Sequence, residues 1–330
     1  MVVTTDVAFR HATAPGIAVS VSDLRKLYGK GDHTTVALDG ISLEIREGER
    51  LGLLGPNGAG KTTFVSILAT QLTPTAGTAS IFGHDVAGDP DAVRRSIGYV
   101  PQDIALYPTL SADENLRFFG ALQGLGGGLL RERIDEVLAL AGLEDVARKK
   151  VQTFSGGMKR RLNLAVGVMH HPKLLLLDEP TVGVDPQSRN HILQRIRALN
   201  EEAGVTIVYT THYMEEVESL CDRVAIIDRG NIIAHDTVQA LSGGTSGAAL
   251  TVSCDNPDAL AVGLRVADGV SDVLKAESGQ VTFTCPSSSA GLATLVEVAR
   301  TCGIEITDVD VARASLEQVF LRLTGRALRD

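Results

Sequence analysis

The segment Gly55–Thr62, with the sequence GPNGAGKT, constrains the fold of this chain more than any other feature. It matches the pattern G-x-x-x-x-G-K-T and follows the apolar run Leu51–Leu54. Glycines let a loop curl so that its N–H groups point inward, and the start of the following helix adds to their attraction for phosphate. Lys61 can reach the β- and γ-phosphates of a nucleotide, and the Thr62 hydroxyl can ligate Mg²⁺. The sequence therefore predicts a strand, a phosphate-binding loop and a helix; a glycine-rich turn that matches by chance is the alternative.

Length, charge and cysteine spacing narrow the classes of protein that this chain can represent. Its 330 residues favour one large domain accompanied by a smaller one. The formal net charge is −9, so the composition predicts no nucleic-acid partner. The four cysteines are far apart and form no C-x-x-C pair: Cys221, Cys254, Cys285 and Cys302. We expect them to be buried thiols of a protein from a reducing compartment.

Residues 1–16 are expected to form a flexible leader. They include Asp6, Arg10 and His11 and contain no continuous apolar segment, which argues against a signal peptide. The longest apolar runs, such as Leu174–Leu177, have the length of a strand and not of a membrane span. We therefore expect no direct membrane span, so a role at a membrane would require a second polypeptide.

The hydropathy pattern predicts an α/β fold with two domains. Alternating apolar residues over 17–45 predict antiparallel strands, and later short apolar runs separated by helical segments predict a mostly parallel core sheet. Helical patterns predominate over about residues 111–168, which we expect to form a helical subdomain of a first domain covering 17–242. The glycine-rich residues 243–247 are typical of a linker, and residues 248–330 are expected to form a small α+β domain.

A last helix is expected from about Ser315. Four apolar residues fall on one face of it: Leu316, Val319, Phe320 and Leu323. We expect this face to pack in the core of the small C-terminal domain. A docking or dimerisation surface is the alternative interpretation.

Two carboxylates follow the four leucines at 174–177. A parallel strand beside the strand of the phosphate-binding loop would place Asp178 near a bound metal ion. Asp178 can then hold Mg²⁺, and Glu179 can accept a proton from an attacking water molecule. A solvated acidic pair at a strand end is the alternative, but it explains poorly why the pair follows a buried strand in a chain with a phosphate-binding loop.

Ser155, Gly156 and Gly157 begin a helix shortly before that strand. Ser155 is suited to cap the helix, and the two glycines allow a phosphate to approach its first turn closely. With this third motif the chain resembles the ATP-binding cassette (ABC) ATPases over about residues 17–242, with the motifs in the order of that family. The resemblance implies an ABC-type phosphate-loop ATPase domain with antiparallel and helical subdomains, and it implies ATP and Mg²⁺ as ligands.

The resemblance also implies roles for single residues. Tyr28 matches the aromatic residue that stacks on adenine, and Gln102 matches the glutamine that touches Mg²⁺ and the attacking water. Asp185 matches the loop that crosses to a partner subunit, and His212 matches the histidine that contacts the γ-phosphate. The catalytic set implied is Glu179, His212 and Gln102, and the metal set is Thr62, Gln102 and Asp178. The nucleotide-binding set is Tyr28, Gly55, Pro56, Asn57, Gly58, Ala59, Gly60, Lys61, Thr62, Thr63, Ser155, Gly156, Gly157 and Asp185.

Two residues depart from the usual signature of the family. Phe154 replaces the usual Leu before Ser155, and Met158 replaces the usual Gln after the glycines. Both substitutions leave the serine hydroxyl and the backbone N–H groups in place, so they bear on the packing of this helix and not on its contact with phosphate.

Three longer segments resemble the ATP-binding subunits of ABC-2 type exporters of the daunorubicin-resistance and multidrug type: residues 106–111, 178–189 and 315–326. This resemblance implies a homodimer of ATPase subunits, a separate transmembrane permease, and a peripheral location on the cytoplasmic side of the cell membrane. It implies efflux of a drug or lipid-like substrate. A soluble ABC ATPase that acts on a cytoplasmic assembly is the alternative. An isolated phosphate-loop kinase would leave the Ser155 helix start without a role.

Overall fold

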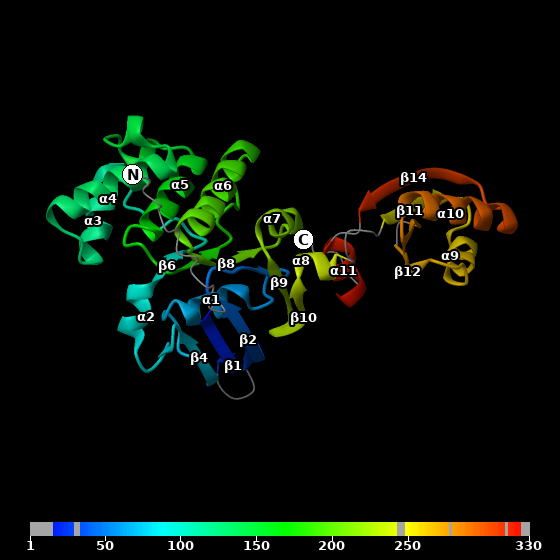
Figure 1. The fold of residues 1–330 in the computed structure, drawn as a ribbon, viewed down its shortest axis with the longest axis horizontal. Helices are drawn as coiled ribbons and strands as arrows, with labels where there is room; N and C mark the ends of the chain where they lie inside the picture. Colours follow the sequence, from blue (N-terminus) through cyan, green and yellow to red (C-terminus); the bar gives the residue numbers. More distant parts are fainter. Residues whose placement is uncertain (1–15, 30–33, 243–247, 277–278, 314–315, 325–330) are drawn as a thin grey trace, which may run out of the picture. The chain divides into compact units, whose positions relative to one another are not determined.

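The computed structural model describes residues 16–29, 34–242, 248–276, 279–313 and 316–324 (Figure 1). Most of the expected leader and the expected linker at 243–247 lie outside the described residues. The chain forms two compact units, one of residues 1–51 and 61–210 and the other of residues 52–60 and 211–330.

The first unit contains an antiparallel sheet with the strand order β2-β1-β4-β5. Its strands are β1 (Ile17–Tyr28), β2 (Thr35–Arg46), β4 (Ala76–Ile81) and β5 (His84–Asp85). In β1 and β2 buried residues alternate with exposed ones over much of each strand, as the sequence predicts, because one face of the sheet is covered.

Three parallel strands lie in the same unit, and the middle one ends in Asp178. They are β6 (Ile97–Val100), β7 (Leu174–Asp178) and β8 (Thr206–Thr211), with β7 between the other two. Every residue of β7 is buried, which is why this strand is a continuous apolar run and does not alternate. Helix α1 (Lys61–Leu68) packs against β7, and α2 (Pro90–Ser96) and α6 (Pro186–Ala203) complete this part of the unit. The carboxyl end of β7 thus lies within reach of the start of α1.

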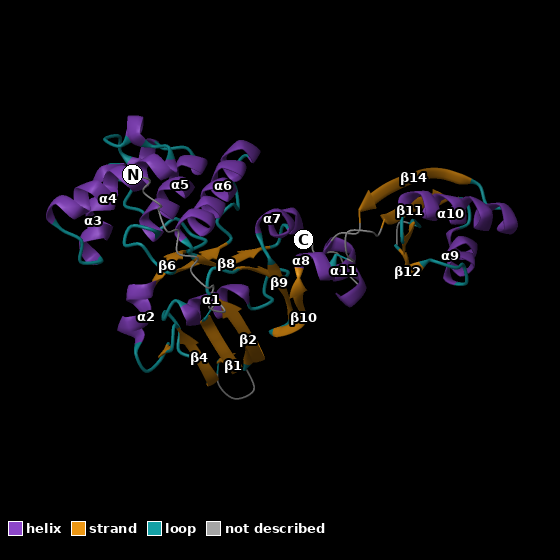
Figure 2. Cartoon of the chain, in the orientation of Figure 1, coloured by secondary structure: helices purple, strands orange, loops and turns teal. Residues whose placement is uncertain are grey.

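The expected helical segment contains α3 (Ala112–Leu122), α4 (Gly127–Ala141) and α5 (Gly156–Gly167), which appear as purple coils in Figure 2. Ser111 and Glu114 form a capping box at the start of α3, and Gly142 ends α4 in the left-handed conformation. Arg133 of α4 donates hydrogen bonds to the carbonyl oxygens of Val168 and Met169 at the end of α5. These bonds satisfy carbonyl groups that the helix leaves without partners.

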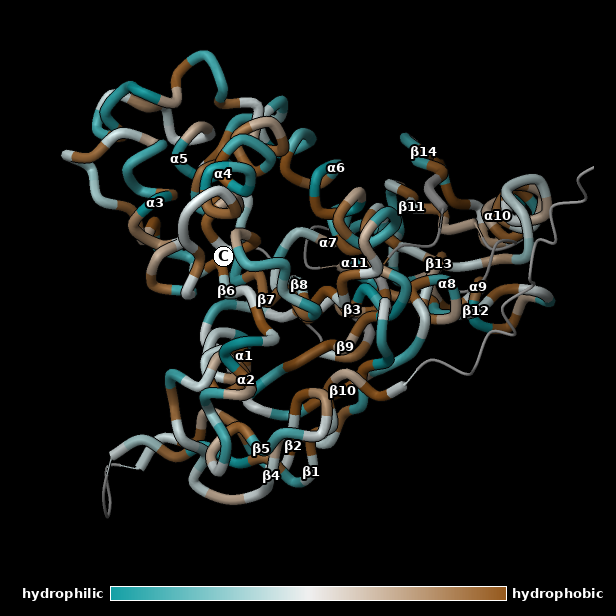
Figure 3. The backbone as a smooth tube through the Cα atoms, turned by 60° about the vertical axis from the view of Figure 1, so that its left-hand side comes forward, coloured by the Kyte–Doolittle hydropathy of each residue, from teal (hydrophilic) through white to brown (hydrophobic). Residues whose placement is uncertain are grey.

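In the second unit, β9 (Arg223–Asp228) lies between β10 (Asn231–Thr237) and β3 (Arg50–Leu54), the strand that enters this unit at residue 52. Strands β9 and β10 are antiparallel. The tube of β9 is largely brown in Figure 3, because Val224–Ile227 are all hydrophobic and buried. Helices α7 (Met214–Leu220) and α8 (Val238–Leu241) flank these two strands along the chain.

The small C-terminal domain is a four-stranded antiparallel sheet with two helices. The strand order is β12-β13-β11-β14, and the elements are β11 (Ala248–Cys254), α9 (Pro257–Arg265), β12 (Ser271–Lys275), β13 (Val281–Cys285), α10 (Ser288–Cys302) and β14 (Ile306–Arg313). Its core includes Leu250, Leu264, Phe283 and Leu295. The expected α+β class of this domain agrees with these elements.

The expectation of four buried thiols was wrong for half of them. Cys221 and Cys285 are buried, but Cys254 is half-buried and Cys302 is exposed. Cys302 is the last residue of α10. These four cysteines form no disulfide bond in the described structure.

The last helix, α11 (Leu316–Thr324), packs against α7 and α8. Leu316, Val319 and Phe320 are buried, and the backbone N–H of Leu316 donates a hydrogen bond to Glu218 of α7 at 2.7 Å. The sequence correctly predicts a buried face, but the expectation that this face belongs to the core of the small domain is wrong. The chain leaves the small domain after β14 and returns to the helices that precede that domain.

Across the described parts of the chain, we find no helix with both the length and the apolar character needed to cross a membrane.

Candidate functional site

The loop Gly55–Gly60 is held closely against the end of β9 and the turn that follows it. A Cβ atom on Gly55 would lie 2.3 Å from the carbonyl oxygen of Ile227, so only glycine fits there. Gly60 has a φ of +112°, a conformation that other residues rarely adopt. The Ala59 carbonyl accepts a hydrogen bond from the Gly230 N–H at 2.9 Å. The loop backbone is therefore fixed, with Asn57 and Gly58 left exposed at its tip.

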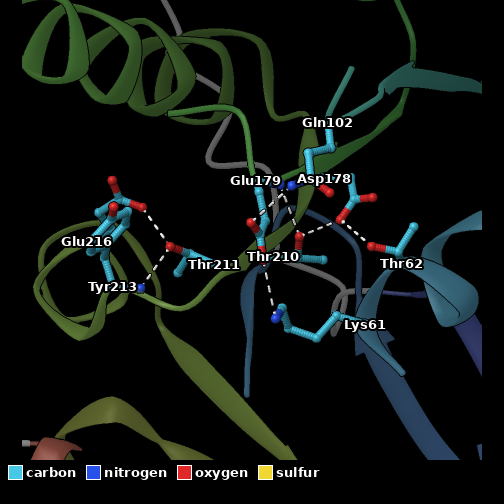
Figure 4. Close-up of polar contacts among 9 residues, drawn as sticks. All are labelled: Lys61, Thr62, Gln102, Asp178, Glu179, Thr210, Thr211, Tyr213 and Glu216. Carbon is cyan, nitrogen blue, oxygen red and sulfur yellow. Dashed lines mark hydrogen bonds and ion pairs between the residues drawn. The ribbon is translucent and has the colours of Figure 1, made fainter. Parts of the chain in front are cut away.

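Lys61 and Thr62, the first residues of α1, meet the two carboxylates at the end of β7 (Figure 4). The Lys61 ammonium lies 3.1 Å from Glu179, and both side chains are almost fully buried. The Thr62 hydroxyl donates a hydrogen bond to Oδ1 of Asp178 at 3.3 Å. The structure thus brings together four of the residues that the sequence singles out, from segments more than a hundred positions apart.

Asp178 is the most deeply buried carboxylate of this cluster, with 1% of its surface exposed. Its Oδ1 also accepts a hydrogen bond from the Thr210 hydroxyl at 2.7 Å. Burial raises the pKa of Asp178, against the hydrogen bonds from Thr210 and Thr62, which lower it. Among the residues that the structure describes, no group donates a hydrogen bond to its Oδ2. A buried carboxylate oxygen without a donor, beside a threonine hydroxyl, fits a hard cation such as Mg²⁺.

Glu179 has an unusual backbone conformation. Its φ is +45°, which is uncommon for a residue with a side chain and is found often at functional sites. The Glu179 N–H donates to Thr210, with the carbonyl oxygen at 3.2 Å and the hydroxyl at 3.0 Å. The Gln102 amide donates to the Glu179 carboxylate at 3.4 Å. Hydrogen bonds to both the backbone and the carboxylate of Glu179 therefore fix the direction of this side chain.

His212 lies at the start of a turn that the structure holds by side-chain bonds. The Thr211 hydroxyl donates to the buried Glu216 at 2.7 Å and accepts from the Tyr213 N–H at 2.9 Å (Figure 4). The His212 ring lies against the Tyr213 ring, with 4.2 Å between the ring centres. His212 belongs to the second unit and Glu179 to the first.

The Ser155 helix and Asp185 form a second group. Ser155 caps α5 by accepting a hydrogen bond from the Met158 N–H, and Asp185 caps α6 by accepting one from the Ser188 N–H at 2.9 Å. Hydrogen bonds from the backbone and the side chain of Ser188 lower the pKa of Asp185. A Cβ atom on Gly157 would lie 2.2 Å from Oγ of Ser188, so the starts of the two helices pack closely. Ser155 and Gly156 remain exposed.

Three further positions were named in the sequence analysis. Tyr28 ends β1 with 40% of its surface exposed, and the Lys26 ammonium lies 5.3 Å from the centre of its ring. Phe154, the departure in the signature, is buried beside the start of α5. Thr63 is half-buried in the first turn of α1.

The sequence interpretation missed Thr210 as a member of the site. Its hydroxyl donates to Asp178 and accepts from the backbone of Glu179, so it fixes both carboxylates. The dipeptide Thr210–Thr211 before His212 was the available signal. Which of the two hydroxyls points to the carboxylates depends on the register of β8 beside β7, where Asp178 pairs with Thr210.

Comparisons with known proteins identify the family of this chain. The family model for the ABC transporter matches residues 38–182. The chain is 43% identical to the linearmycin resistance ATP-binding protein LnrL of Bacillus subtilis, over 94% of this chain and 100% of that protein. It is 38% identical to the daunorubicin/doxorubicin resistance ATP-binding protein DrrA of Streptomyces peucetius, over 96% of each chain.

A solved dimer of the ATP-binding cassette MJ0796 in a post-hydrolysis state, bound to ADP and Pi, superimposes with a TM-score of 0.62 and 31% identity. It covers 66% of this chain and 98% of that chain.

Proposed function

The chain belongs to the ABC transporter family and is an ATPase that hydrolyses ATP for transport, and we propose that it powers an exporter of the drug-resistance type. The observation that carries the proposal is the meeting of α1 with the end of β7. There, Lys61 contacts Glu179 and Thr62 contacts Asp178. A phosphate-binding loop that leads directly into these residues supports hydrolysis of a nucleoside triphosphate.

In this proposal Thr62 and Asp178 hold Mg²⁺, and the Gln102 amide lies beside it. Mg²⁺ bound there would neutralise charge on the phosphate oxygens. Asp178 suits this role because its Oδ2 is buried without a donor in the described structure. Lys61 binds the β- and γ-phosphates, and the backbone of Gly55–Gly60 with Thr63 encloses them.

Glu179 acts as the general base for the attacking water, oriented by Gln102. General-base assistance of this kind contributes about 10²- to 10⁴-fold in rate. The support is geometric, since the backbone of Glu179 is fixed by Thr210 and its carboxylate by Lys61 and Gln102. His212 contacts the γ-phosphate from the turn after β8, and Tyr28 stacks on the base. Stacking of this kind contributes about 1–3 kcal/mol.

We propose that two copies of the chain form the active unit. Each copy has one phosphate-binding loop and one Ser155 helix start, and the signature of one copy covers the nucleotide held by the other. The exposure of Ser155 and Gly156 supports this arrangement, as does the dimeric state of MJ0796. Asp185, which caps α6 beside Gly157, lies at the same contact.

A separate permease is the proposed membrane partner, with this chain on the cytoplasmic side. The similar proteins LnrL and DrrA are named for resistance to linearmycin, doxorubicin and daunorubicin, which supports efflux of a drug or lipid-like substrate. Tyr107 and Phe118 offer a surface for that partner. Their rings meet edge to face with centres 4.9 Å apart, yet both are more than one-third exposed, close to Gln102 in sequence.

Two measurements test this function. The purified chain should hydrolyse ATP only with Mg²⁺, and the tagged chain should recover a multi-spanning membrane protein in about equal amounts from mildly solubilised native membranes. A purified chain that does not hydrolyse ATP in the presence of Mg²⁺ would refute the ATPase assignment. Recovery of only soluble partners, with hydrolysis intact, would retain the ATPase and replace the exporter with a soluble ABC ATPase that acts on a cytoplasmic assembly.

A further inference from the structure

One face of α5 binds the backbone of the segment that carries Gln102. Arg160 donates a hydrogen bond from Nη1 to the Gln102 carbonyl. Asn163, one turn further along the helix, donates to the Pro101 carbonyl at 3.4 Å and accepts from the Ala105 N–H at 3.3 Å. Residues three apart on a helix share a face, so these two side chains act on the same segment. The helix that begins with Ser155 is thus attached to the Gln102 segment through three backbone groups.

Arg160 has a second partner on another segment. Its Nη2 donates to the Val182 carbonyl at 3.2 Å. Val182 lies between Glu179 and Asp185, and its N–H donates back to the Glu179 carbonyl at 3.3 Å. One guanidinium therefore joins α5, the Gln102 segment and the segment that leads from Glu179 to Asp185.

The chemistry of arginine suits this position. A guanidinium is planar and presents several N–H donors in a fixed fork, whereas the lysine ammonium is a single point of charge. Hydrogen bonds from a charged donor are stronger than neutral ones, and more so when the group is partly removed from water. Burial lowers the pKa of Arg160, while Asp103 and Glu179 raise it. Arginine remains protonated in proteins, so Arg160 is a partly buried charge that two carbonyl groups accept and that Asp103 and Glu179 stabilise.

We infer that Arg160 is a positioning residue for ATP hydrolysis, which sets the Gln102 segment relative to Glu179 and to the loop ending at Asp185. The inference rests on the proposed function, because Gln102 and Glu179 have their roles there. The Gln102 amide lies 3.4 Å from the Glu179 carboxylate, at the edge of hydrogen-bonding distance, so a small shift of the Gln102 backbone decides whether that contact forms.

Arg161 provides a matched control on the same helix. It is also a partly buried arginine whose pKa is lowered by burial, and it also donates to two backbone carbonyls. Those carbonyls belong to Ala141 and Gly142 at the end of α4 and not to the segments of Gln102 and Val182, while the charge of Asp185 raises the pKa of Arg161. Substitution of Arg161 removes an arginine from α5 but leaves the bonds of Arg160 to Gln102 and Val182 in place.

The experiment compares Arg160→Met, Arg160→Lys and Arg161→Met in the full chain. We expect Arg160→Met to lower kcat by about tenfold to a hundredfold, the range that a misplacement of about 1 Å produces, while the KM for ATP stays within about twofold. Arg160→Lys should recover part of kcat, because one carbonyl bond is kept. Arg161→Met should lower the unfolding temperature and leave kcat within about threefold of the original chain.

Hydrogen exchange gives the readout that a purely structural role would not change. On addition of MgATP, peptides covering residues 55–62, 102–106 and 181–185 should all gain protection in the original chain. In Arg160→Met only the first should do so. Equal losses of kcat in Arg160→Met and Arg161→Met, or an unchanged kcat in Arg160→Met, would overturn the inference. Failure of the original chain to bind or hydrolyse ATP would instead refute the proposed function.

Discussion

The Lys61 ammonium lies 3.1 Å from the Glu179 carboxylate, in an ion pair whose side chains are 5% and 6% exposed. A buried charge without its partner is costly, so each of these groups depends on the other. In the proposed reaction Lys61 also binds phosphate, which means that the nucleotide and Glu179 share one ammonium group.

Glu179→Gln should bind ATP more tightly and hydrolyse it slowly. The neutral amide competes less for Lys61, and the general base is lost, which lowers kcat by about 10²- to 10⁴-fold. Two copies of the variant should remain associated in the presence of ATP, as measured by light scattering. Glu201→Gln is the control, because Glu201 forms an ion pair with Arg50 while 58% exposed. Normal steady-state hydrolysis by Glu179→Gln would contradict the assignment of the base.

Asp178→Asn should separate stability from function. Burial raises the pKa of Asp178, so its charged form destabilises the folded state, and an amide keeps the acceptor for Thr62 and Thr210. Without nucleotide we expect an increase of about 2–4 °C in Tm, the effect of roughly 1 kcal/mol in a domain of this size. Hydrolysis that depends on Mg²⁺ should be lost. A decrease in Tm would show that the carboxylate stabilises the fold.

Gly157→Ala should destabilise the first unit more than Gly156→Ala. The added methyl group of the first variant meets Ser188 at 2.2 Å, whereas at Gly156 the nearest atom is 3.9 Å away. Overpacking of this kind costs about 1–3 kcal/mol. Urea unfolding measures both variants, and Ser188→Gly should recover part of the loss in the first. Equal stability of the two alanine variants would disprove the close contact between α5 and α6.

Phe320→Ala should release α11 from α7 and α8. Phe320 is fully buried in this contact, while Leu323 on the same helix is 44% exposed and serves as the control. Truncation of a buried phenylalanine costs about 3–5 kcal/mol, enough to free a nine-residue helix. Amide exchange in residues 316–324 should increase in Phe320→Ala and remain unchanged in Leu323→Ala. Unchanged exchange in both variants would contradict the packing of Phe320 against α7 and α8.

Acidification should destabilise the chain partly through His170. Its Nε2 donates to the Ile97 carbonyl at 2.8 Å, and burial lowers its pKa from the ordinary value of 6.5. The unfolded chain therefore binds this proton more readily, so stability falls as the pH drops through about 6.5 and levels off below the lowered pKa. Urea unfolding between about pH 7.5 and about pH 5.5 should show a smaller loss of stability in His170→Gln than in the original chain. An identical loss would exclude His170.

The sequence predicts those parts of the site that lie in continuous segments. The loop at 55–62 and the pair at 178–179 each combine an apolar strand with polar residues at its end, and their local patterns identify them. Thr210 could not be assigned in this way, because its bond to Asp178 depends on pairing between β7 and β8. Arg160 was missed for a similar reason, because its two carbonyl partners belong to loops distant in the sequence. Every residue has a backbone carbonyl group, so the sequence does not indicate which of them accept a hydrogen bond.

The same limit explains the interpretation of the last helix. An apolar face at helical spacing predicts that the face is buried, but it does not identify what buries it. Leu316 and Phe320 are buried as expected, against α7 and α8 in place of the small domain. In that domain Asn256 caps α9 and Pro257 begins it, which is a helix start that the sequence pattern can show.

The return of α11 to α7 and α8 means that the small domain is, in topological terms, an insertion and not an appendage. It is joined to one packed group of helices through α8 at its beginning and through α11 at its end. An inserted module can be exchanged for another of different sequence, provided that its two ends still lie within reach of α8 and α11. We therefore expect the chain between these helices to accept such an exchange while α11 keeps its contacts with α7 and α8.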